Sequence, residues 1–276
     1  MPTQIELLGT HPIEPTEFHR WLSCNDYEIT ATKNHRGLNA IIESDAQLLN
    51  WLSDLLIVHH YSDENLELLR EKYSELGYPL FAEQNRRLPT TDKTKKGNLA
   101  EILLVEYIIS CVGSDLLKAY RLRYNTNVDQ SMKGDDALLV KLLNQGEQSS
   151  VKVYFGEAKY RATPNKDAVD KIVSALASNK NPISYSYLIT ELLRNEDTKE
   201  LGKQLSNFNI NEIKRLGNLT YIGLLMSNEN SNAVVHDALD SSNESLIFVS
   251  LGSPSPNDLV EQTYLLANGK IAGGVI

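Results

Sequence analysis

Cysteine and long apolar runs are scarce in this chain. Cys24 and Cys111 are the only cysteines among 276 residues, so no framework of disulfides is expected and a reducing compartment suits the protein. No apolar run approaches the ~20 residues that cross a bilayer. The N-terminus also lacks the basic and then apolar stretches of a secretory signal. We therefore expect a cytoplasmic protein that does not associate with membranes.

An excess of positive charge is also missing. The chain has 27 lysines and arginines against 36 aspartates and glutamates, which gives a formal net charge of −9. A protein that holds duplex DNA by itself usually presents a basic face, because neutralised phosphates supply most of the non-specific affinity. The charge therefore argues against a free-standing DNA-binding protein. It does not exclude a nuclease subunit whose basic residues are concentrated locally or whose partner holds the DNA.

A polar, basic connector, Gln84–Gly97, is the clearest boundary in the sequence. It predicts a mainly helical N-terminal region, residues 1–92, followed by a second domain, residues 93–276. Helices are expected in the first region at 47–60 and 63–76, from their length and apolar spacing. The connector itself has two interpretations, a contact to the DNA backbone or a solvated linker, and the sequence does not decide between them.

From Asn98 onward, the pattern predicts a mixed α/β sheet with helices on its faces. The expected elements follow one another along the chain as a helix at 98–112, strands at 117–125, 136–143 and 151–160, a helix at 166–178, one or two helices between 182 and 208, strands at 219–226 and 245–251, and a helix at 257–266. The segment 144–150 between the second and third strands is expected to be a turn, so these two strands form a hairpin.

The hairpin carries the most informative residues. Glu157 and Lys159 end its second strand, after three apolar residues at alternate positions that share their face. A charged pair at the end of an apolar stripe is costly unless it is paired, solvated or bound to metal. Asp136 opens the first strand at the parity of that strand's own apolar face. If both apolar faces lie on one side of the hairpin, Asp136 and Glu157 converge.

Two carboxylates with open positions suit Mg²⁺, which keeps several waters and takes phosphate oxygens as further ligands, and Mn²⁺ is possible in its place. Such an ion polarises a scissile phosphate and lowers the pKa of an attacking water. Lys159 would orient or deprotonate that water, or stabilise charge on the phosphate. Glu101, expected in the first turns of the 98–112 helix, offers a further ligand. Asp135 remains an alternative to Asp136, because a bulge would change the parity.

Glu-x-Lys alone carries no information, and Glu212-Ile213-Lys214 is a second example, in polar sequence that is expected to be helix or loop. Only Glu157-Ala158-Lys159 ends a β-branched strand and follows an acid that opens the preceding strand. A salt bridge on an edge strand is the structural alternative. His59-His60 also suggests a metal site, but adjacent histidines point in different directions on a helix and have no partner at i+4. We therefore interpret them as structural.

The residues Asp136 and Glu157-Ala158-Lys159, after a helix that carries Glu101, resemble the PD-(D/E)xK nuclease superfamily with its αβββαβ core. Asp135 stands where the motif has proline, a common departure. More narrowly, three segments resemble the HamA family, the effectors of Hachiman antiphage defence: KGNLAE at 96–101, KGDD at 133–136 and GEAKY at 156–160.

This resemblance implies a DNA nuclease with Glu101, Asp136, Glu157 and Lys159 as catalytic residues and the three acids as metal ligands. It also implies a helicase partner of the HamB kind that holds the nuclease, which would fit the acidic charge. Two alternatives stay open. One is a non-catalytic, nuclease-like binding or regulatory subunit, and the other is a self-sufficient restriction or repair nuclease with site specificity.

Overall fold

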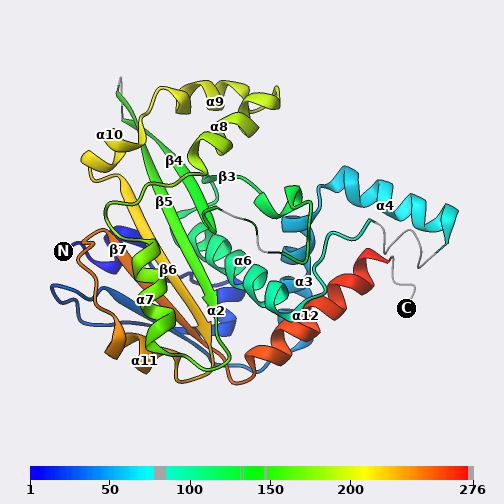
Figure 1. The fold of residues 1–276 in the computed structure, drawn as a ribbon, viewed down its shortest axis with the longest axis horizontal. Coiled ribbons are helices and arrows are strands. Elements are labelled where there is room, and N and C mark those ends of the chain that lie inside the picture. Colours follow the sequence, from blue (N-terminus) through cyan, green and yellow to red (C-terminus); the bar gives the residue numbers. More distant parts are fainter. Residues whose placement is uncertain (78–84, 131, 133, 146–147, 273–276) are drawn as a thin grey trace.

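A seven-stranded mixed sheet runs through the computed structural model, which describes residues 1–77, 85–130, 132, 134–145 and 148–272. The strand order is β1-β2-β7-β6-β5-β4-β3, with helices on both faces (Figure 1). Three parallel strands form its centre: β5 (Gln148–Tyr160), β6 (Leu219–Ser227) and β7 (Leu246–Gly252). β4 (Ala137–Gln145) pairs antiparallel with β5. The predicted mixed α/β sheet flanked by helices is confirmed, and it is compatible with a nuclease-like core.

The N-terminal region contributes two strands to this sheet. β2 (His35–Ala40) runs parallel to β7, and β1 (Leu22–Asp26) pairs antiparallel with β2 at the edge. Neither strand was predicted, because both are short and polar. The division into regions 1–92 and 93–276 stays a prediction, although the sheet runs across it.

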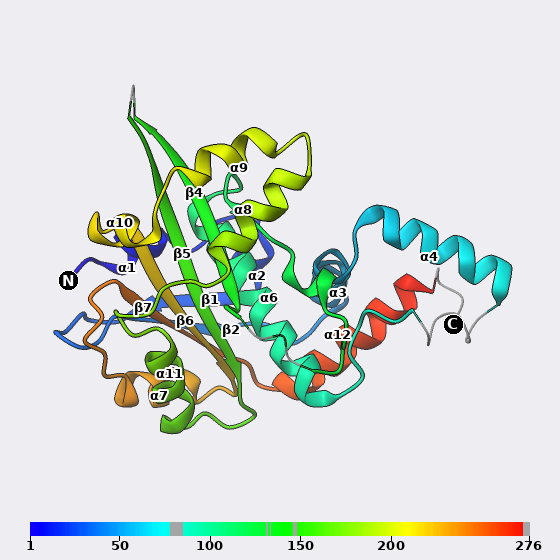
Figure 2. The same ribbon diagram turned by 45° about the horizontal axis from the view of Figure 1, so that its top comes forward.

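The helices form a layer on each face of the sheet (Figure 2). One layer consists of α1 (Gln4–Leu8), α2 (Glu17–Trp21), α3 (Ala46–His60), α6 (Asp92–Val112) and α12 (Pro256–Ile271). The other consists of α7 (Lys166–Ala175), α8 (Tyr185–Arg194), α9 (Lys199–Ser206), α10 (Ile210–Arg215) and α11 (Ser231–Ala238). α4 (Asp63–Leu76) extends away from the sheet in both views. No helix in the described ranges is long and apolar enough to cross a membrane.

Strand alternation explains why β5 is buried on both faces. Val153 and Phe155 pack in the core under α7 and α8, whereas Tyr154 and Ala158 pack in the core under α6. Gly156 faces α6, and a Cβ at this position would lie 2.7 Å from the Leu104 side chain. The glycine therefore allows α6 to lie close against the end of β5 that carries the hairpin acids.

The predicted strand at 117–125 is wrong over most of its length. Only β3 (Leu117–Lys118) pairs with β4, and the chain then turns into the 3₁₀ helix η1 (Arg121–Tyr124). The arginines of this segment explain the change. Arg121 contacts Glu101 on α6 and Arg123 donates to the Val58 carbonyl on α3. Glu101 and Val58 both belong to helices that cover one face of the sheet. The contacts of the two arginines therefore favour a turn of the chain toward these helices and not a longer edge strand.

Other boundaries differ from expectation because of tertiary contacts. α6 begins at Asp92 and not at Asn98, so residues 92–97 of the expected connector are helical. Its Lys95 and Lys96 lie over the rings of Tyr264 and Tyr160. Gln84, where the connector was expected to begin, lies outside the described residues. Residues 146 and 147 of the expected turn also lie outside the described residues. The turn is shorter than expected, because β4 ends at Gln145 and β5 begins at Gln148. The short helices α1, α10 and α11 were not predicted.

Candidate active site

The register of the β4–β5 hairpin brings Asp136 to Glu157. Ala137 pairs with Gly156, so Asp136, one residue before β4, lies next to Glu157 on β5. The Oδ2 atom of Asp136 accepts a hydrogen bond from the Ala158 backbone N–H at 2.9 Å. The sequence fixes this arrangement through the two alternating apolar strands, whose registration places both acids at one end of the hairpin.

Glu157 and Lys159 lie on one face of β5, as their parity requires. The Nζ atom of Lys159 donates to Oε1 of Glu157 at 2.6 Å. Both side chains remain partly accessible, with about a fifth of their surface exposed (20% and 23%). The pair thus lies where the buried part of the strand ends and solvent begins.

Glu101 reaches the same place from α6. The sequence predicted Glu101 in the first turns of its helix. Because the helix begins at Asp92, Glu101 instead lies well inside it. Stabilisation by the helix dipole fades beyond the first turn, so it does not account for an acid at this position. Glu101 is instead buried and paired with an arginine that the sequence did not reveal.

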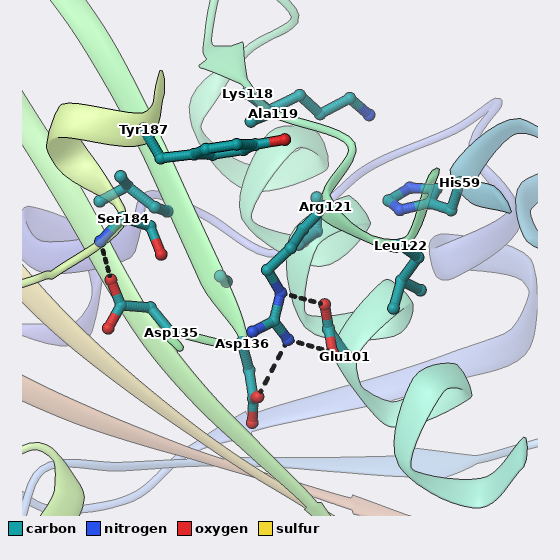
Figure 3. Close-up of a pocket in the computed structure, with 13 residues that line it drawn as sticks. His59, Glu101, Lys118, Ala119, Arg121, Leu122, Asp135, Asp136, Ser184 and Tyr187 are labelled. Atoms are coloured by element: carbon teal, nitrogen blue, oxygen red, sulfur yellow. Dashed lines mark hydrogen bonds and ion pairs between the residues drawn. The ribbon is translucent and has the colours of Figure 1, made fainter. Parts of the chain in front are cut away.

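That arginine is Arg121, which lies between two of the acids (Figure 3). Its Nε and Nη2 atoms donate to the two carboxylate oxygens of Glu101 at 3.2 and 2.7 Å. Nη2 also donates to Oδ1 of Asp136 at 3.4 Å. Arg121 belongs to η1, in the segment predicted to be a strand, and no spacing in the sequence links it to the acids.

The consecutive acids Asp135 and Asp136 point to different partners. Asp135 accepts the backbone N–H of Ser184 at 2.7 Å, at the start of α8. Asp136 points toward Arg121 and Ala158 (Figure 3). Of the two candidate ligands, Asp136 is the one that the structure places beside Glu157.

Burial shapes the electrostatics of the site. It raises the pKa of Glu101 to about 8, against the lowering effect of Arg121, and the negative charges of Asp136 and Glu157 add to the increase. The pKa of Asp136 is raised to about 6, first by burial and then by Glu157. Both shifts express the cost of crowding carboxylates in a poorly solvated place, a cost that a bound cation would reduce.

The donor chemistry of Glu101, Asp136 and Glu157 fits a hard divalent cation, since all three offer carboxylate oxygens. Their spacing in this structure is too wide for all three to bind one metal ion. Among the residues that the structure describes, no three His, Cys, Asp or Glu side chains lie close enough together to hold a metal ion. Arg121 stands between Glu101 and Asp136, and Lys159 pairs with Glu157.

The chain was compared with known proteins. The HamA family model matches residues 16–265, a range that contains every residue of the candidate site. Hachiman protein HamA of Bacillus cereus is 34% identical over 278 residues, which cover 99% of this chain and 98% of that protein. The chain belongs to the HamA family. The resemblance inferred from short motifs between Lys96 and Arg161 therefore extends over nearly the whole chain, including the N-terminal strands and α12.

Two further features of this HamA-family chain complete the surroundings of the site. His59 shares a hydrogen bond with Glu106 at 2.7 Å, and His60 shares one with the Leu56 carbonyl at 2.8 Å, so each histidine has a partner within the helical layer. A cavity of about 30 Å³, large enough for a water molecule, borders Arg121. Tyr187 and Ser184 line it on the side of α8 (Figure 3).

Proposed function

We propose that this HamA-family chain is a Mg²⁺-dependent DNA nuclease, a phosphodiester hydrolase of an antiviral defence system of the Hachiman type. A partner helicase restrains and directs it, and the complex works in the cytoplasm. The observation that carries the proposal is the arrangement of Asp136, Glu157 and Lys159 at one end of the β4–β5 hairpin, with Glu101 joined to Asp136 through Arg121. The B. cereus relative is named as a Hachiman protein, which supports the setting.

Asp136 and Glu157, with Glu101, are the residues that would hold the ion. Bound there, Mg²⁺ or Mn²⁺ would polarise the phosphodiester and favour hydrolysis. Lys159 is already oriented by Glu157 and remains partly exposed. Its ammonium group can orient the attacking water or stabilise negative charge that develops on the phosphate, whereas deprotonation of the water would require the uncharged amine.

The need for a partner follows from charge. The chain carries a net charge of −9, and the two cations of the site, Arg121 and Lys159, are both paired with its acids. Little positive charge therefore remains at the site to attract a phosphate backbone. A helicase that binds DNA would supply the affinity that this chain lacks, and it would control when the nuclease meets its substrate.

The test is a plasmid digestion with Mg²⁺ or EDTA, carried out with and without the partner helicase. We expect progressive loss of all DNA with Mg²⁺ and no loss with EDTA or with Glu157→Ala. Glu212→Ala is the matched control. Glu212 belongs to the second Glu-x-Lys triplet, which lies on α10, and its side chain is exposed. Cleavage by Glu157→Ala at the rate of the unmodified chain would refute the proposal. Discrete fragments would instead support a site-specific nuclease.

One observation favours a second candidate, a non-catalytic nuclease-like subunit. The acids are already paired with Arg121 and Lys159, and no metal-sized cluster forms in the described part of the chain. Titration calorimetry with MgCl₂ and MnCl₂ separates the two. A folded protein that binds neither ion would support the regulatory subunit, and binding that Glu157→Ala abolishes would support the nuclease.

A further inference from the structure

The guanidinium of Arg121 occupies the space between two candidate ligands. Its Nη2 atom lies 2.7 Å from an oxygen of Glu101 and 3.4 Å from an oxygen of Asp136. One positively charged nitrogen thus contacts carboxylates that come from α6 and from the start of β4. A metal ion that bridged these carboxylates would have to stand in the same place.

We propose that Arg121 is the resident cation of this site, which joins Glu101 to Asp136 and must withdraw before a divalent ion can bind both. The inference rests on the proposed metal-dependent function and deepens it. It assigns to the chain's own arginine the regulation of metal binding, so that the acids are held together and neutralised until the arginine leaves.

A comparison with Arg36 distinguishes such a displaceable arginine from a permanent one. Arg36 is fully buried and uses all of its guanidinium nitrogens: Nε and Nη2 donate to Asp26 at 2.6 and 2.8 Å, and Nη1 donates to the Gly9 carbonyl at 3.0 Å. Arg121 is less completely bound. Its Nη1 atom is buried without a hydrogen-bond partner among the described residues, and its contact to Asp136 is long. An unsatisfied buried donor raises the free energy of this state, which makes withdrawal easier.

The position of Arg121 in the chain also suits withdrawal. It opens the four-residue helix η1, which follows the two-residue strand β3 and lies outside the extended part of the sheet. Gly134 has a φ of 133°, and a Cβ at this position would lie 3.2 Å from Nη1 of Arg121. Glycine therefore leaves one side of the guanidinium open, beside the small cavity that Ser184 and Tyr187 line. A shift of η1 would move the arginine without disturbing β4 or β5.

Metal binding provides a direct test that does not depend on cleavage. Mn²⁺ is titrated by calorimetry into the full chain, into Arg121→Gln and into Arg123→Gln. We expect Arg121→Gln to bind Mn²⁺ at least tenfold more tightly than the unmodified chain, because the ion no longer competes with a guanidinium. Arg123→Gln is the matched control, since Arg123 lies on the same short helix but contacts the Val58 carbonyl and the Tyr120 ring. It should bind as the unmodified chain does.

Thermal unfolding gives a second measurement of the same competition. Without metal, Arg121→Gln should unfold at a lower temperature, because Glu101 then lacks its partner. Added Mn²⁺ should raise its unfolding temperature more than that of the unmodified chain, since a tighter ligand stabilises the folded state more. If Arg121→Gln fails to fold, Arg121→Lys replaces it. Lysine keeps the charge but loses the planar, two-pronged contact with Glu101. The Arg121→Lys protein should therefore bind Mn²⁺ more tightly than the unmodified chain does.

The outcomes separate this inference from the proposed function. Equal Mn²⁺ affinity in the unmodified chain and in a folded Arg121 variant would overturn the role of Arg121 and leave the metal-dependent nuclease standing. Weaker binding by the variant would overturn it too and would make Arg121 a support of the ligands. No binding by any of the proteins would overturn both.

Discussion

The Nζ atom of Lys159 donates a hydrogen bond of 2.6 Å to Glu157, which lies two residues earlier on β5. Both residues lie where the apolar face of the strand ends. Only about a fifth of each side chain is exposed, and in a pair this buried the cost of removing the charges from water offsets much of their attraction. Packing therefore does not require an acid and a lysine at these positions. A catalytic role gives a reason for both.

Lys159→Ala should abolish DNA cleavage while the fold persists. We expect the cleavage rate to fall at least about 100-fold, the usual contribution of a positioned acid, base or charge-stabilising group. The free energy of unfolding should fall by about 1.5–3 kcal/mol, the contribution of a hydrogen bond between charged groups, which leaves the chain folded. Initial rates on linear DNA with Mg²⁺ and urea denaturation measure the two effects. Lys214→Ala, in the triplet on α10, should leave both unchanged, and a fully active Lys159→Ala protein would contradict the mechanism.

The buried acids should make stability depend on pH. Glu101 has a pKa of about 8 in the folded chain against an ordinary value of 4.5, so the folded state holds its proton more tightly than the unfolded state. Stability from this source is complete below pH 4.5 and is lost as the pH rises through 8. The free energy of unfolding should therefore decline over this window, by up to about 1.4 kcal/mol per pH unit.

Glu101→Gln isolates this contribution, because glutamine does not titrate. In EDTA, the variant should show a flatter decline between pH 5 and 8 than the unmodified chain. The buried histidines titrate in both proteins, so the difference between the two curves removes their effect. Urea denaturation at several pH values provides the curves. Parallel curves would show that Glu101 is already ionised throughout this range.

Gly156→Ala should be destabilising, because the new methyl group would meet Leu104 at 2.7 Å and the Ile222 carbonyl at 3.2 Å. Overpacking of this kind costs about 1–3 kcal/mol. It would also push α6, and with it Glu101, away from the hairpin. Gly97→Ala is the matched control on α6, where a Cβ has no neighbour within 4 Å. That change should stabilise the helix by about 0.5–1 kcal/mol. Thermal unfolding of the two variants should show shifts of opposite sign.

Local pattern explains which parts of the fold could be predicted. The β4–β5 hairpin, β6 and β7 are apolar strands with clear alternation or burial, and α3, α4 and α6 have helical spacing over many residues. β1 and β2 could not be recognised, because these short polar strands are held in the sheet by pairing with strands distant in the sequence or with each other: β2 pairs with β7, and β1 pairs with β2. The strand expected at 117–125 failed for a similar reason. Its arginines bind partners on helices far away in the sequence.

The candidate site shows the same division. Strand parity and hairpin register depend on neighbouring residues, so the sequence indicated that Asp136, Glu157 and Lys159 meet. Arg121 could not be found in this way, because its contact with Glu101 depends on how η1 lies against α6. The direction of Asp135 likewise depends on Ser184, 49 residues away. Contacts between elements, and not patterns within them, decide these two positions.

Asp26→Ala tests whether the N-terminal strands belong to the same cooperative unit as the rest of the sheet. Asp26 on β1 pairs with the fully buried Arg36 on β2, and its loss removes both contacts of that guanidinium to a carboxylate. Removing one partner of a buried ion pair costs about 3–5 kcal/mol. Asp54→Ala, which breaks an exposed pair with Lys270, should cost less than about 1 kcal/mol.

The predicted division at residues 92 and 93 can be examined with the same Asp26→Ala protein. Because β2 pairs with β7, we expect a single transition in urea that shifts as a whole, seen alike by tryptophan fluorescence and by circular dichroism. Trp21 and Trp51 both lie in the N-terminal region, so fluorescence follows that region and circular dichroism follows the whole chain. Two separate transitions, with only the fluorescence one shifted, would instead establish residues 1–92 as an independently folding domain.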